Sequence, residues 1–149
     1  MKIEEILRSK GRNVVTITRE RTVLEAVKIL EENNIGGIVV MEGDRPVGIV
    51  TERDVLRLTA RSPGELGSIT VSSVIVRELI VARPEDQLRE AMQVMTEERI
   101  RHLPVMEGKQ LVGIISIGDL LNACRIVAER ENAHLREYIQ GAVPYTPPS

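Results

Sequence analysis

Two short motifs carry the residue types that could contact a nucleotide. Residues 48–54 read Gly-Ile-Val-Thr-Glu-Arg-Asp, and residues 113–119 read Gly-Ile-Ile-Ser-Ile-Gly-Asp. In each motif the apolar pair predicts the end of a strand, and the hydroxyl residue predicts the start of a helix. The free N–H groups and partial positive charge of a helix start attract an anion such as phosphate. The hydroxyl could donate to phosphate oxygens, while the carboxylate three residues later could accept from two ribose hydroxyls.

The same residue pairs also fit a helix capping box. Thr51 with Asp54, and Ser116 with Asp119, have the required spacing of three residues. In a capping box both side chains satisfy backbone N–H groups and bind no ligand. Either motif taken alone favours this simpler interpretation, because such patterns are common. The repetition of the motif is the reason to consider a ligand site.

The motif belongs to a longer internal repeat. A shift of 65 residues aligns residues 20–56 with residues 85–121 without a gap, and fourteen of the thirty-seven aligned pairs are identical. Composition alone would give about two or three identities. The chain therefore contains a duplicated unit.

Each unit is expected to run strand, helix, strand, strand, helix. The expected strands are residues 14–17, 38–41 and 46–50 in the first unit and 79–82, 103–106 and 111–115 in the second. Apolar residues at helical spacing from Val23 and from Leu88 predict one amphipathic helix per unit, and Thr22 with Glu25 would cap the first. The link, residues 57–73, reads as a loop with a short helical turn near 71–75. Residues 1–9 are expected to form its helical counterpart.

These elements predict an α/β fold of two repeated β-α-β-β-α units. One unit buries too little apolar surface to be stable alone, so the two should pack together and leave a cleft between them. The expected domains are residues 1–66 and 67–125, followed by a C-terminal helix extension and tail at 126–149. The last helix is expected to continue to about Ile139, as a solvated extension or as a dimer contact. A disordered tail is expected from Gly141 onward.

Composition excludes several classes of function. A net charge of -2 argues against nucleic-acid binding, and no apolar run approaches a membrane span, so we expect a cytoplasmic protein without membrane contact. Cys124 reads as a buried, inert thiol, and the two histidines, His102 and His134, give no metal-ligand set. We find no nucleophile–base pair and no phosphate-cradling loop, so an enzyme is not expected.

The duplicated unit closely resembles a tandem pair of cystathionine beta-synthase (CBS) domains, a Bateman module, over residues 1–125. The likeness rests on the two Gly-x-x-Thr/Ser-x-x-Asp motifs in register with the helix starts Thr22-x-x-Glu25-Ala26 and Gln87-x-x-Glu90-Ala91. In that family the two units are packed as a pseudo-twofold pair, the clefts between them bind adenosine-containing ligands, and pairs commonly dimerise. The resemblance therefore implies a homodimer formed through the CBS helices.

The resemblance also implies residues for two nucleotide-binding clefts. The second-motif cleft would use Val15, Arg101, His102, Ser116 and Asp119, with Arg101 and His102 as a phosphate-binding basic pair. The first-motif cleft would use Gly37, Thr51, Arg53, Asp54 and Ile80. Gly36 and Gly37 replace the basic pair there, so the Asp119 cleft is expected to hold phosphates better. By itself, a lone histidine such as His102 is more often a solvated or packed residue than a catalytic one.

The function implied is a regulatory ligand-sensing module that binds AMP, ADP or ATP and requires no cofactor. An assembly module with empty clefts is one alternative, and a binder of S-adenosylmethionine or methylthioadenosine is another. The regulated protein target is not named by the sequence.

Overall fold

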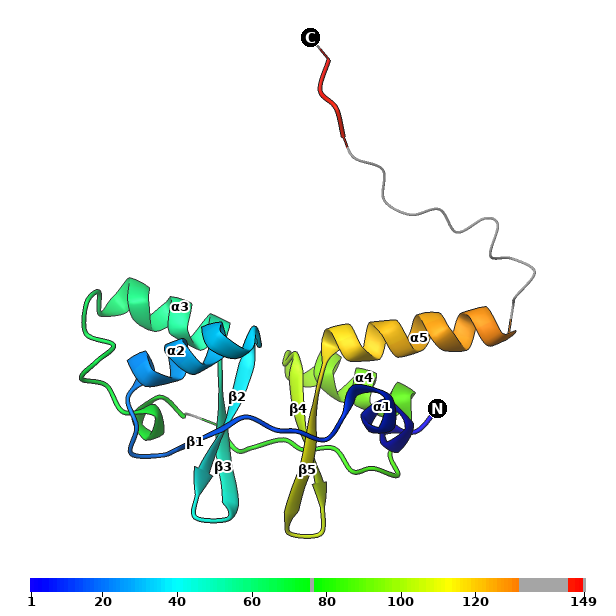
Figure 1. The fold of residues 1–149 in the computed structure, drawn as a ribbon, viewed down its shortest axis with the longest axis horizontal. Coiled ribbons are helices and arrows are strands. Elements are labelled where there is room, and N and C mark those ends of the chain that lie inside the picture. Colours follow the sequence, from blue (N-terminus) through cyan, green and yellow to red (C-terminus); the bar gives the residue numbers. More distant parts are fainter. Residues whose placement is uncertain (76, 132–144, 149) are drawn as a thin grey trace.

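The chain folds into two α/β units that lie side by side (Figure 1). In this computed structural model, residues 1–75, 77–131 and 145–148 are described. The expected extension of the last helix to about Ile139, His134 and the start of the expected tail lie outside the described residues. Within the described ranges, every helix is too short or too polar to cross a bilayer.

The first unit contains a three-stranded sheet covered by two helices. In chain order its elements are β1 (Thr16–Thr18), α2 (Val23–Asn33), β2 (Gly37–Glu42), β3 (Arg45–Thr51) and α3 (Glu52–Arg61). Strand β1 pairs parallel to β2, and β2 pairs antiparallel to β3. Thr22 and Glu25 form the expected capping box of α2. The unit therefore has the predicted order of strand, helix, strand, strand, helix.

The second unit repeats this order with a reduced first strand. Its elements are α4 (Leu88–Glu98), β4 (His102–Glu107), β5 (Gln110–Ser116) and α5 (Ile117–Glu131), and β4 pairs antiparallel to β5. The strand predicted at 79–82 is wrong, because only Ala82 pairs, in a single parallel bridge to Val105. The next N–H, of Arg83, donates instead to Asp86 Oδ2 at 2.9 Å, and Pro84 has no N–H.

The link between the units begins later than predicted. Residues 57–61 belong to α3 and are not loop. This stretch contains no glycine or proline until Pro63-Gly64, so the helix continues to Arg61. The expected helical turn is present as a 3₁₀ helix, η1 (Val71–Val74), and the expected N-terminal helix is α1 (Ile3–Lys10).

The segment ahead of each unit packs on the other unit. Helix α1 buries Ile3 and Leu7 in the core of the second unit, next to Leu103, Ile115 and Leu120. Conversely, Val71 of η1 is buried in the core of the first unit. Helix α1 contacts α5 of the second unit, and in Figure 1 the chain then crosses from α1 to β1 of the first unit. These two crossing segments tie the units together.

Candidate functional site

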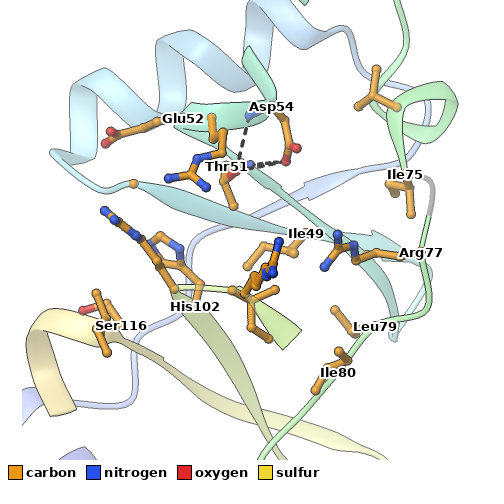
Figure 2. Close-up of a pocket in the computed structure, with 18 of the residues that line it drawn as sticks. Ile49, Thr51, Glu52, Asp54, Ile75, Arg77, Leu79, Ile80, His102 and Ser116 are labelled. Atoms are coloured by element: carbon orange, nitrogen blue, oxygen red, sulfur yellow. Dashed lines mark hydrogen bonds between the residues drawn. The ribbon is translucent and has the colours of Figure 1, made fainter. Parts of the chain in front are cut away.

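A pocket of about 640 Å³ lies between the two units. The first unit contributes the end of β3 and the start of α3, and the second unit contributes residues 99–102 and 116–118. The crossing segment after η1 closes one side with residues 74, 75 and 77–80. Figure 2 shows Thr51 and Asp54 on one side of this pocket, with His102 and Ser116 on the other. A ligand here would contact both units.

Thr51 and Asp54 form a complete capping box at the start of α3. The Thr51 N–H and hydroxyl donate to Asp54 Oδ2 at 2.9 and 3.0 Å, and the Asp54 N–H donates to Thr51 Oγ1 at 3.4 Å. The capping interpretation of this motif is therefore confirmed. The cap uses only Oδ2 of the carboxylate, so Oδ1 is left to accept from a ligand.

The pocket is rich in positive charge although the whole chain is acidic. Five arginines line it against three acids: Arg53, Arg57, Arg77, Arg99 and Arg101 against Glu52, Asp54 and Glu78. Arginine binds phosphate through its planar fork of N–H donors. The N-terminal end of α3 adds the partial positive charge of a helix start. The pocket is thus suited to an anionic group.

Aliphatic side chains form the other wall of the pocket. Ile49, Ile75, Leu79, Ile80 and Ile100 all line it. Figure 2 shows Ile75, Leu79 and Ile80 on the same side, along the crossing segment. Such a wall could pack against a flat heterocycle without aromatic stacking.

His102 lies at the boundary between the two units. A Cβ built on Gly36 would lie 3.3 Å from His102 Nε2, and one on Gly37 would lie 3.1 Å from Cγ and Cδ2. The Nδ1 atom is buried and has no hydrogen-bond partner among the described residues. Burial lowers the pKa of His102 from its ordinary value, and the charge of Lys10 lowers that pKa further. The surroundings of His102 therefore disfavour the protonated imidazole.

The second motif also forms a capping box, but Asp119 has an additional partner. The Ser116 N–H donates to Asp119 Oδ2 at 2.8 Å, and Lys10 Nζ donates to the same oxygen at 2.6 Å. Burial by itself would raise the pKa of Asp119. The hydrogen bonds from Lys10 and Ser116 outweigh burial and hold that pKa below its ordinary value.

The structure brings most of the predicted site residues together in the first-motif pocket. Those that line it are Thr51, Arg53, Asp54, Ile80, Arg101, His102 and Ser116. This pocket thus includes three residues that the resemblance assigns to the second-motif cleft. Arg101, His102 and Ser116 line it together with Thr51 and Asp54. Asp119 does not line the pocket, and Gly37 lies against His102. Val15 packs against the core of the first unit.

Sequence reasoning missed four basic residues near the two motifs. Arg57, Arg77 and Arg99 line the pocket, and Lys10 binds Asp119. A repeat search could not find them, because Lys10 and Arg57 lie outside the identical pairs and the other two are scattered among acidic residues. For Lys10, the only signal was a basic residue in the last turn of the N-terminal helix.

Comparison with known proteins gives consistent matches over most of the chain. A family model described as CBS domain matches twice, over residues 3–61 and 71–126. The CBS domain-containing protein CBSX3, mitochondrial, of Arabidopsis thaliana is 36% identical over 148 residues, which cover 93% of this chain and 72% of that protein.

Two solved structures are similar in both fold and sequence. The CBS-domain containing protein ATU1752 from Agrobacterium tumefaciens superposes with a TM-score of 0.80 at 33% identity, over 83% of this chain and 99% of that one. The CBS domain protein PAE2072 from Pyrobaculum aerophilum, complexed with AMP, gives a TM-score of 0.76 at 28% identity, over 89% and 99% of the two chains.

Proposed function

The chain belongs to the CBS-domain family, and from this premise we propose that it is a regulatory module that senses an adenosine-containing nucleotide. The proposed ligands are AMP, ADP and ATP, bound in the pocket between the two units. CBS domains are regulatory modules and not catalytic domains, so the proposed role is binding without turnover. No cofactor is needed for it.

The observation that carries this proposal is the combination of groups in one pocket. A carboxylate with a free oxygen, the N-terminal end of α3, five arginines and an aliphatic wall all face the same space. The carboxylate matches the ribose, the helix end and the arginines match the phosphates, and the aliphatic wall matches the base of a nucleotide. The AMP complex of the Pyrobaculum aerophilum protein supports this ligand class by analogy.

Regulation would follow from the position of the pocket between the units. A ligand that contacts both units favours one relative arrangement of them over others. At a free concentration of about 100 times its dissociation constant, a ligand stabilises the state that it binds by about 2.7 kcal/mol. This corresponds to a shift of about 100-fold in the ratio of the two arrangements, which is how binding could be passed on to a protein target.

We further propose that the pair forms a homodimer through its helices. Leu56 of α3, which also lines the edge of the pocket, and Leu121 of α5 occupy equivalent positions in the repeat, and they are 70% and 56% exposed. Two large aliphatic side chains at equivalent helix positions are suited to a symmetric contact.

One observation favours a second candidate function, an assembly module. Both capping boxes are complete without any ligand, so the two motifs already have a structural role. Thermal-shift titration with AMP, ADP, ATP, S-adenosylmethionine and methylthioadenosine separates the two functions. A selective rise in Tm with an adenine nucleotide is the expected result. No shift with any of the five compounds would contradict the sensing function and leave the assembly module.

A further inference from the structure

The two capping-box aspartates occupy equivalent positions but have different partners. Asp54 and Asp119 are separated by the repeat shift of 65 residues. Among the described residues, the hydrogen bonds of Asp54 all come from its own capping box. Asp119 has a partner from outside its motif, because Lys10 Nζ lies 2.6 Å from its Oδ2.

Two acceptors hold the ammonium group of Lys10. Besides Asp119, the carbonyl oxygen of Ile114 accepts from Nζ at 2.7 Å. The side chains of Lys10 and Asp119 are 34% and 24% exposed, which makes this pair the least exposed of the ion pairs among the described residues. A partly buried pair is less screened by solvent than an exposed one. The ion pair between Lys10 and Asp119 of the second motif is therefore stronger than an exposed surface pair.

Helix α1 is anchored, so the position of Lys10 at its last turn is fixed. Ile3 and Leu7 have no exposed surface and pack in the core of the second unit. At the other end, the Ile3 N–H donates to Asp86 O at 2.9 Å, and the Leu88 N–H donates to Met1 O at 2.9 Å. The helix is thus fastened to the unit whose motif Lys10 reaches.

The contact that seats α1 also aims Lys10 at its acceptors. A Cβ built on Gly113 would lie 2.6 Å from Leu7 Cδ2, so only glycine allows this close approach. Lys10 follows Leu7 by three residues and lies on the same face of the helix. Ile114, whose carbonyl accepts from Lys10, directly follows Gly113. The ion pair is therefore a consequence of how α1 packs on β5.

The first unit has no comparable arrangement in the described residues. Ile75 lies over Gly48, the equivalent glycine, where a Cβ would be 2.6 Å from its Cδ1. However, the element ahead of Ile75 is the four-residue η1, whereas α1 has eight residues. Ile75 itself is apolar and lines the pocket beside Asp54. Among the described residues, Asp54 thus has no partner outside its capping box, whereas Asp119 is paired with Lys10.

From this difference we infer that Lys10 is an internal lock on the second motif, so that the chain binds one nucleotide per pair of units. The inference rests on the proposed function, since it assumes that Asp54 marks a nucleotide site. The Lys10 ammonium lies 2.6 Å from Asp119 Oδ2, the oxygen that the cap also uses, so a positive charge already faces the carboxylate to which a ribose would donate. A ligand at the second motif must compete with this charge, which we expect to cost about 10- to 100-fold in affinity.

Calorimetric titration with AMP tests the lock with matched variants. Lys10→Met keeps the aliphatic stem and removes the ammonium. Arg8→Met removes the same charge from the same helix turn, where the exposed Arg8 pairs, among the described residues, with Glu4 at 3.1 Å. We expect one site per chain in the wild type and in Arg8→Met, and a second site in Lys10→Met. In an Asp54→Ala background, Lys10→Met should restore binding and Arg8→Met should not.

The outcomes distinguish the lock from the proposed function. If the wild type binds AMP but Asp54→Ala/Lys10→Met binds no better than Asp54→Ala, the lock is wrong and the proposed function stands. If neither the wild type nor Lys10→Met binds, both are contradicted. A readout without ligand comes from NMR titration of the Asp119 carboxyl group. Its pKa should rise in Lys10→Met and not in Arg8→Met, and an unchanged pKa in Lys10→Met would overturn the lock.

Discussion

The imidazole of His102 lies directly against Gly37, the residue at the equivalent position of the other unit. A Cβ built on Gly37 would lie 3.1 Å from both Cγ and Cδ2 of the ring. The two positions differ by the repeat shift of 65 residues, so the pseudo-twofold arrangement brings them together. Only one of two such positions can carry a large side chain in a packed interface. The glycines at 36 and 37 therefore make room for His102.

This contact predicts that Gly37→Ala is destabilising. The new methyl group must push the His102 ring aside, which should cost about 1–2 kcal/mol of the free energy of unfolding. His102→Ala in the same chain should recover most of that loss. Gly67→Ala is the control, because its Cβ would meet Leu24 at an ordinary 3.5 Å. Urea denaturation measures all four variants, and strictly additive effects of Gly37→Ala and His102→Ala would contradict the contact.

The arginines of the pocket should distinguish ligands by their number of phosphates. We expect Arg53→Gln and Arg101→Gln each to weaken ATP binding by about tenfold and to leave adenosine binding nearly unchanged, because only phosphate uses the guanidinium. Arg45→Gln is the control, since Arg45 lies on the β2–β3 hairpin and pairs with Glu42 at 3.2 Å. Calorimetry with both ligands measures the effect. An equal loss for ATP and adenosine would refute a phosphate role.

The buried His102 should make stability depend on pH. Burial, followed by the charge of Lys10, lowers the pKa of His102. A histidine with a lowered folded pKa adds stability above its unfolded pKa of about 6.5, and this stability is lost as the pH falls toward the folded value. We expect the free energy of unfolding to drop more in the wild type than in His102→Gln between about pH 7.5 and 5.5. Parallel pH profiles would show that burial of His102 has no such effect.

The exposed leucines predict how a homodimer is held together. Leu121 is 56% exposed on α5, so Leu121→Glu should place a charge in the proposed contact and yield a monomer. Leu24→Glu is the control. It places the same charge on α2, outside the proposed contact of α3 and α5, at a leucine that is 39% exposed. Light scattering over a range of concentrations gives the mass of each variant. A Leu121→Glu protein with the same mass as the wild type would contradict the proposed interface.

The sequence predicts the local parts of this fold well. Helix caps and hairpins depend on residues only a few positions apart, so Thr22 with Glu25 marks the start of α2 correctly. Gly43 and Gly108, at positive φ, mark the two hairpin turns for the same reason. The 65-residue repeat then transfers the elements of one unit to the other, except for the strand at 79–82.

The sequence does not predict which distant segments meet. The exchange of α1 and η1 between the units depends on packing across the whole chain, and no local pattern encodes it. For this reason Lys10 could not be linked to Asp119, which lies 109 residues later. The grouping of Arg101 and His102 with Asp54 likewise depends on how the two units dock.

The most direct test of the central proposal is calorimetric titration of AMP into the wild type, Asp54→Ala and Glu25→Ala. Asp54 and Glu25 are both the third-residue acids of capping boxes, but only Asp54 lines the pocket. Loss of a hydrogen bond to a charged group costs about 1.5–3 kcal/mol, so Asp54→Ala should weaken binding about 10- to 100-fold. Glu25→Ala should bind AMP as the wild type does. Equal affinity of Asp54→Ala and the wild type would contradict the assignment of the nucleotide to this pocket.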